Sequence, residues 1–279
     1  MRIRILGSAA GGGAPQWNCA CATCESTRRA GTNRLQDTVA VSGDGSAWYL
    51  LNASPDIRTQ IIATPDLAPG PGLRETPLRG VLLTTAELDH TLGLLSLREA
   101  VGLTVYATPA VTAALTVAFP LAPTLAHYTD LDWRVLTDKL SLDGGLEVTR
   151  LTVGAKRPRY AAGVSGEGWT SALRLTSRET ERSFLYATCL PVWTPEFDEL
   201  VAGTDVALLD GTFVTDDELT RTTGRPGSAR SMGHLPVEET RPRFAEHPRT
   251  RFLYGHLNNT NPLASRLAGP DIVDDGQEI

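Results

Sequence analysis

Short runs of apolar residues recur along the chain, and most of them are too short for helices and end at glycine, proline or polar residues. These runs predict strands over residues 2–6, 38–41, 47–52, 81–83, 104–108, 146–153, 171–175, 183–187, 206–210 and 251–255. Helices are expected from residue 57, after residue 109, and after the Asp89-His90 pair, where Leu92, Leu95 and Leu97 are close to helical spacing. Residues 66–79 are rich in Pro and Gly and predict a surface loop. Because no repeat or linker interrupts it, this pattern predicts one α/β or α+β domain with mixed sheets covered by helices.

The composition is that of a soluble globular protein. The 279 residues are 41% hydrophobic and 21% charged, which is enough for a sizeable core. The net charge of −6 argues against a nucleic-acid partner, because phosphate binding needs clustered Lys and Arg. No stretch is long enough to span a bilayer and no signal-peptide core follows the first strand, so a cytoplasmic protein without a membrane partner is expected.

A glycine-rich segment, residues 7–13, follows the first predicted strand. Its order is not the G-x-G-x-x-G of dinucleotide-binding folds, and no Gly-Lys-Ser/Thr follows for a phosphate loop. We therefore expect a tight turn in which backbone segments pack closely.

Three of the four cysteines lie within six residues, at Cys19, Cys21 and Cys24. The spacing Cys-x-Cys-x-x-Cys brings three thiolates together on a tight loop, at about residues 15–25, and suits a tetrahedral structural zinc. Unrelated thiols are the alternative. No fourth ligand is apparent nearby in the sequence. The remaining cysteine, Cys189, lies in an apolar context and is expected to be a small buried residue.

Two of the five histidines, His90 and His256, follow apolar strands, and Asp89 precedes the first of them. Two histidines and one carboxylate form a face with open metal positions, typical of non-haem Fe(II) enzymes. The alternative is a turn aspartate beside a partly buried histidine, since nothing in the spacing says that these strand ends meet.

A second carboxylate–histidine pair is Asp210, which closes an apolar run, and His234. A carboxylate that orients a histidine makes a proton carrier near neutral pH. Two separate polar contacts on loops are the alternative. His127 and His247 are expected at the surface or in packing contacts.

Several motifs together resemble a known family. They are residues 7–13 with the Pro15–Cys21 segment, Asn52-Ala53-Ser54-Pro55-Asp56-Ile57-Arg58, Leu88-Asp89-His90-Thr91 with residues 93–99, Asp210-Gly211-Thr212, Met232-Gly233-His234-Leu235, and Asn258-Asn259-Thr260-Asn261-Pro262. Across the whole chain they resemble PqqB, the pyrroloquinoline quinone (PQQ) biosynthesis family of the metallo-β-lactamase superfamily. The resemblance implies one αββα sandwich over residues 1–279, with the metal site at the edge between two sheets.

The resemblance also implies an activity. Superfamily hydrolases bind two zincs through His-x-His-x-Asp-His, and the matching positions here, residues 85–90, keep only the final Asp89 and His90. One metal position is thus largely dismantled. The resemblance implies an Fe(II)- and O₂-dependent hydroxylase that acts on the tyrosine ring of a cross-linked Glu-Tyr precursor. In that hypothesis Asp89, His90 and His256 hold the iron with Glu87 as a further contact, and Asp210 and His234 form the acid/base pair.

A substrate with several carboxylates calls for cations near the site, and Lys156, Arg157, Arg159 and Arg230 are the candidates, with solvated surface roles as the alternative. In related phosphodiesterases a histidine completes the three-cysteine zinc site, and Asn259 stands at that position here. Other PQQ biosynthesis enzymes are expected partners, and a homodimer is left open. Two other functions stay open: a metal-dependent hydrolase, and a carrier or export factor for PQQ or its precursor.

Overall fold

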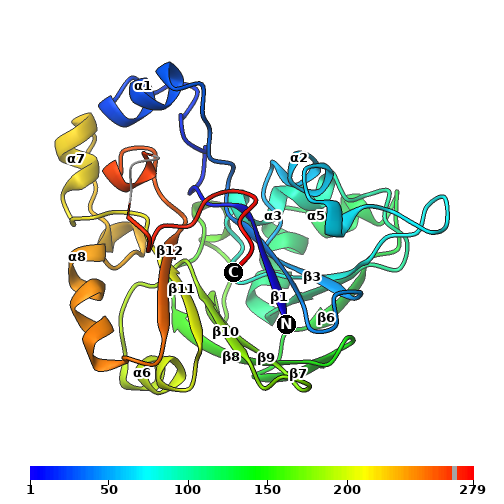
Figure 1. Ribbon diagram of the computed structural model, residues 1–279. Helices are drawn as coiled ribbons and strands as arrows, with labels where there is room; N and C mark the ends of the chain where they lie inside the picture. The colour runs from blue at the N-terminus through cyan, green and yellow to red at the C-terminus, as the bar shows by residue number, and fades with distance from the viewer. Residues whose placement is uncertain (266–268) are drawn as a thin grey trace.

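Two six-stranded sheets form the centre of the computed structural model, which describes residues 1–265 and 269–279 (Figure 1). The first sheet contains, in order, β1 (Arg2–Gly7), β2 (Thr38–Ser42), β3 (Trp48–Leu51), β4 (Leu78–Leu82), β5 (Thr104–Ala107) and β6 (Asp132–Val135). The second contains β7 (Lys139–Leu142), β8 (Leu146–Gly154), β9 (Thr170–Ser177), β10 (Ser183–Ala187), β11 (Val206–Asp210) and β12 (Arg251–Gly255). Both sheets are mixed: β3 to β6 and β10 to β12 are parallel, and the other neighbours pair antiparallel.

Three hydrophobic clusters define the layers. The middle cluster joins the facing sides of the two sheets, for example Ile5 and Leu51 with Phe184 and Leu208. The outer clusters lie between each sheet and its helices. One packs the first sheet against α2 (Ile57–Ile62), α4 (Pro109–Ala113) and α5 (Leu121–Leu125), and the other packs the second sheet against α6 (Pro195–Ala202) and α8 (Val237–Thr240). The protein is therefore an αββα sandwich, as predicted.

Four of the predicted strands are buried on both faces. Every residue of β2, β3, β10 and β11 is buried, because each strand lies between the middle layer and an outer layer. Continuous apolar runs are typical of such strands. The pattern missed β6 and β7, whose residues are mostly exposed or half-buried. An edge strand with little buried surface leaves no apolar run to detect.

The prediction of a helix after Asp89 and His90 is wrong in the length of that helix. The structure has one short helix, α3 (Leu88–Thr91), followed by a 3₁₀ turn at Leu92–Leu95. Backbone contact explains the change, because the Gly93 N–H donates to the Ala53 carbonyl at 2.9 Å and a Cβ on Gly93 would lie 2.3 Å from the Ser54 oxygen. The core takes Leu94 and Leu97, and Leu95 is partly exposed.

The predicted surface loop ends at β4, two residues earlier than expected, and the glycine segment forms the predicted tight turn. Gly12 and Gly13 have φ of +94° and +68°, in the left-handed region that favours glycine. The remaining helices, α1 (Ala22–Arg29) and α7 (Glu218–Thr223), lie beside each other at one end of the molecule (Figure 1). Among the described residues no helix has the length and apolar character needed to cross a bilayer.

Candidate active site

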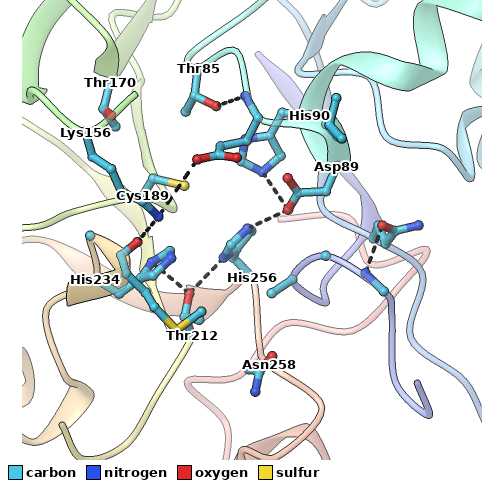
Figure 2. Close-up of a pocket in the computed structure, with 18 of the residues that line it drawn as sticks. Thr85, Asp89, His90, Lys156, Thr170, Cys189, Thr212, His234, His256 and Asn258 are labelled. Carbon is cyan, nitrogen blue, oxygen red and sulfur yellow. Dashed lines mark hydrogen bonds and ion pairs between the residues drawn. The ribbon is translucent and has the colours of Figure 1, made fainter. Parts of the chain in front are cut away.

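Polar side chains gather where four parallel strands end. Asp89 and His90 follow β4, Cys189 follows β10, Asp210 closes β11 and His256 follows β12. Ligands of open α/β sheets bind outside the carboxyl ends of strands, because loops there can carry chemistry on a fixed frame. A cavity of about 450 Å³ opens at this edge. The residues labelled in Figure 2 surround it.

The structure brings Asp89, His90 and His256 together. The His256 Nε2 lies 3.5 Å from Asp89 Oδ2, the His90 Nε2 lies 3.9 Å from the same oxygen, and the two imidazole centres are 5.1 Å apart. Gly11 permits this approach, because a Cβ there would lie 3.0 Å from Asp89 Oδ2. The Nε2 atoms of both imidazoles therefore lie within 4 Å of one oxygen of the Asp89 carboxylate.

These imidazoles fit a cation. His90 and His256 are 1% and 3% exposed, yet both ring nitrogens of His90 and the Nε2 of His256 have no hydrogen-bond partner. Buried polar atoms without partners are rare and costly, and a bound metal would satisfy them. Burial lowers the pKa of His90, so its ring is neutral and keeps a lone pair. Burial also opposes the charge on Asp89, but the two imidazoles outweigh it and hold the pKa of that carboxyl well below its usual range.

One hydroxyl orients His256. The Thr212 Oγ1 lies 2.7 Å from Asp210 Oδ1 and 2.8 Å from His256 Nδ1. A carboxylate only accepts, so the hydroxyl donates to Asp210 and accepts from the Nδ1–H of His256. This assignment places the proton on Nδ1 and leaves the Nε2 lone pair facing the cavity. The ring also stands on a strained backbone, because His256 has a φ of +55°.

The predicted Asp210–His234 pair is in contact. Asp210 Oδ2 lies 2.8 Å from His234 Nδ1, Asp210 is fully buried, and the His234 ring stacks on His256 with centres 5.5 Å apart. Burial opposes the charge on Asp210, but His234 outweighs it and lowers the pKa of the carboxyl. Since Nδ1–H donates to Asp210, the Nε2 of His234 is free to accept a proton at the cavity wall.

A buried network that the sequence did not reveal lies behind His90. The Asp37 Oδ2 accepts hydrogen bonds from the hydroxyls of Tyr186 and Thr188 and lies 3.8 Å from His90 Nε2. The Tyr186 hydroxyl also accepts from Asn52, so the network joins both sheets beneath the site. Burial and the Asp37 carboxylate raise the pKa of Tyr186 well above its usual value.

Cys189 was predicted to be a small buried residue, but the structure places it at the cavity. It is half-buried and lines the cavity, with its Sγ within 4.8 Å of a nitrogen of His90 and of His256. Burial, then the charges of Asp210 and Asp89, raise the pKa of its thiol well above the usual value. The end-of-strand position was the signal that could have found it, as it found Asp89 and His256.

The four basic side chains predicted to bind substrate carboxylates lie in different places. Lys156 lines the cavity, donates to the Met232 carbonyl, and holds its Nζ 3.8 Å from the Oε1 of Glu87 (Figure 2). Glu87 also lines the cavity, so the structure places it beside Lys156. Arg157 and Arg159 line a smaller adjoining hollow, and Arg230 is paired with Glu239.

The three clustered cysteines meet beside Asn259, the neighbour in sequence of the cavity-lining Asn258. The sulphur atoms of Cys19, Cys21 and Cys24 lie within 4.8 Å of one another. Asn259 faces them, with its Nδ2 3.4 Å from Cys24 Sγ and its main-chain oxygen 3.4 Å from Cys21 Sγ. Burial raises the pKa of Cys21 to about 11. The expected tight loop is wrong in part, because Cys21 caps helix α1 and Cys24 lies in its first turn.

The other two histidines lie outside the site. His127 is exposed, and His247 is buried with its Nε2 2.9 Å from Asp198 Oδ1. Both fit the predicted surface and packing roles.

Comparison with known proteins identifies the class. A family model described as the beta-lactamase superfamily domain matches residues 47–257, and the sandwich with its edge site defines a domain of that superfamily. A diphosphatase from the PhnP family has the same fold, with a TM-score of 0.69 at 20% identity over 100% of this chain and 97% of that one.

More similar proteins define the family. The coenzyme PQQ synthesis protein B of Bradyrhizobium diazoefficiens is 36% identical over 306 residues, covering 100% of this chain and 99% of that protein. The Cupriavidus necator protein of the same name is 38% identical, covering 99% and 98%. The crystal structure of Zn²⁺-bound PqqB from Methylobacterium extorquens is 34% identical with a TM-score of 0.87, covering 100% and 99%. The chain belongs to the coenzyme PQQ synthesis protein B family, which confirms the predicted resemblance.

Proposed function

We propose that this protein acts in PQQ biosynthesis as an Fe(II)- and O₂-dependent hydroxylase of the tyrosine ring of a small cross-linked Glu-Tyr precursor, in the cytoplasm. The observation that carries the proposal is the pair of buried imidazoles, His90 and His256, whose unpartnered nitrogens face the Asp89 carboxylate. Two histidines and one carboxylate are the donor set that leaves coordination positions open for oxygen and substrate. The names of its relatives support the pathway.

In this proposal Asp89, His90 and His256 hold the iron. When bound, iron would supply oxygen activation, with one oxygen atom entering the ring as hydroxyl and the other leaving as water at the expense of an external reductant. Burial lowers the pKa of His90, so its ring offers a lone pair, and the Thr212 hydroxyl favours the His256 tautomer with its proton on Nδ1. Burial opposes a charge on His256, but the Asp89 carboxylate outweighs it and raises the pKa of that ring, so metal binding would displace a proton from its Nε2.

His234 takes the phenol proton. Its Nε2 faces the cavity while its Nδ1–H is fixed by Asp210, so the ring can accept a proton and the carboxylate stabilises the resulting charge. Lys156, at the cavity wall beside Glu87, binds a carboxylate of the substrate. Aromatic oxidation and proton transfer thus use neighbouring side chains of one cavity, since the His234 ring stacks on His256.

A two-cation hydrolase is the second function to consider, since Asp210, His234 and His256 also lie within 4.8 Å of one another. Hydrogen bonds already occupy Asp210, however. Its Oδ1 accepts from the N–H and the hydroxyl of Thr212, and its Oδ2 accepts from the Leu190 N–H and from His234. A carboxylate with four such bonds has no lone pair left for a metal. This argues for one cation and against two-metal hydrolysis.

The zinc proposal is separate. We propose that Cys19, Cys21 and Cys24 hold a structural zinc, with Asn259 on the fourth side. This site lies apart from the cavity and has no catalytic duty.

The decisive experiment loads the protein with Fe(II) without oxygen, then adds ¹⁸O₂, a reductant and the tyrosine-containing precursor, and records product mass. We expect ¹⁸O in the ring, lost in His90→Ala and kept in His247→Ala, a buried histidine outside the cavity. Zinc-supported phosphodiester cleavage without oxygen would favour the hydrolase. Tight PQQ binding without any product, unchanged in His256→Ala, would favour the carrier.

A further inference from the structure

Cys189 is the donor that the iron hypothesis leaves unused. Its thiol lies at the end of β10, on the cavity wall opposite Asp89, and Figure 2 shows its sulphur directed toward the space between the labelled His90 and His256 rings. The Sγ and one nitrogen of each imidazole all lie within 4.8 Å of one another. A cation at bonding distance from both imidazoles would therefore also be close to this sulphur.

The two imidazoles near this sulphur have ring nitrogens available for a metal. His90 and His256 are both more than nine-tenths buried, and both ring nitrogens of His90 and the Nε2 of His256 have no hydrogen-bond partner. Asp37, the other acidic group near His90, is absent from the cavity lining, and its Oδ2 already accepts two hydrogen bonds. Cys189 is thus a thiol of the second sheet that lines the cavity close to both imidazoles.

We infer that Cys189 is a fourth protein ligand of the active-site cation, so that the site is a two-nitrogen, one-oxygen, one-sulphur centre. The inference rests on the metal site of the proposed function. Binding replaces the S–H bond by a metal–sulphur bond and releases one proton to solvent. No oxidant or reductant is needed.

Two consequences follow from coordination chemistry. A thiolate raises affinity for soft or borderline cations, so zinc and cobalt should compete strongly with iron. Four protein ligands fill a tetrahedral zinc and leave it no open position, whereas a six-coordinate iron keeps two. The same residues would then give an inert zinc form and a reactive iron form.

Cobalt substitution tests the inference without activity. The clustered cysteines also bind cobalt, so the spectrum of His256→Ala, which keeps that cluster, is subtracted from the others. Wild type minus His256→Ala should show a thiolate-to-cobalt charge-transfer band together with visible d–d bands. Cys189→Ser minus His256→Ala should keep d–d bands and lose the charge-transfer band. Zinc affinity at this site should fall by at least about tenfold in Cys189→Ser.

The outcomes separate the two proposals. Equal charge-transfer intensity in wild type and Cys189→Ser would overturn the sulphur ligand alone. Equal cobalt content in wild type and His256→Ala would overturn the metal site and the proposed function with it. If Cys189→Ser does not fold, alkylation of the wild type decides. Zinc should protect Cys189 from iodoacetamide, read peptide by peptide, and should fail to protect it in His256→Ala. A Cys189 that reacts equally with and without zinc also overturns the inference.

Discussion

Replacing Thr212 by valine removes the hydroxyl that fixes the proton of His256. Thr212 is 3% exposed, and its Oγ1 is 2.8 Å from His256 Nδ1 and 2.7 Å from Asp210 Oδ1. Valine puts a methyl group where the hydroxyl was and leaves the shape nearly unchanged. The variant therefore tests one hydrogen-bond chain without opening a cavity.

The expected loss comes from the tautomer. Without the hydroxyl, the Nδ1–H of His256 is a buried donor with no acceptor, which costs about 1–3 kcal/mol. The ring escapes that cost by moving its proton to Nε2, where Asp89 Oδ2 lies 3.5 Å away. Metal binding must then reverse the move. A factor of ten in affinity corresponds to about 1.4 kcal/mol, so the variant should bind iron or zinc about 10- to 100-fold more weakly.

The assay is competition with a chelator of known affinity, run on wild type, Thr212→Val and Thr212→Ser. Serine keeps the hydroxyl and should bind the metal as wild type does. Urea unfolding of the apoproteins separates stability from affinity. If Thr212→Val loses stability and binds metal as tightly as the wild type, the tautomer argument is refuted.

Three further predictions use other parts of the molecule. His234→Gln should lower turnover about 10²- to 10⁴-fold with metal content unchanged, measured by product formation and elemental analysis, and lost metal would contradict a proton-transfer role. Cys24→Ser should lose one zinc equivalent and melt at a lower temperature, whereas unchanged zinc would contradict the cysteine site. Burial raises the pKa of Tyr160 to about 12, and its neutral hydroxyl donates to the Ala86 carbonyl. A raised folded-state pKa contributes stability that is complete below the unfolded value of about 10 and is lost as the pH rises through 12. Tyr160→Phe should therefore be less stable by about 0.5–1.5 kcal/mol at pH 8, with the difference shrinking above pH 10 in urea unfolding, and a constant difference would contradict it.

The sequence predicted the frame of the site because buried parallel strands have a strong signal. Strands such as β4 and β11 are short apolar runs that end at polar residues, so the positions of Asp89 and Asp210 could be read directly. The sequence could not show that those strand ends meet in the folded protein. That meeting depends on how two sheets pack, and spacing along the chain carries no information on that.

The parts that stayed hidden are those defined by contacts between distant segments. Thr212 has an ordinary sequence context, and its role follows only from the positions of His256 and Asp210. Asp37 lies just before β2, more than 50 residues from His90, and the two meet only in the folded protein. The short α3 was hidden for the same reason, because contact with the Ala53 segment decides its length.

The hydrogen bonding of Asp210 and of Asp89 explains why one cation is expected at a site that holds several carboxylates. Asp210 is fully buried and uses its oxygens for four hydrogen bonds, which stabilise its charge without a metal. Asp89 keeps an oxygen within 4 Å of the Nε2 atoms of two imidazoles, and neither of these nitrogens has a hydrogen-bond partner. A half-buried charge beside unpartnered imidazole nitrogens favours a counter-charge, so we expect the cation at Asp89. Asp210→Asn should therefore impair His234 and leave the metal in place, whereas Asp89→Asn should release it.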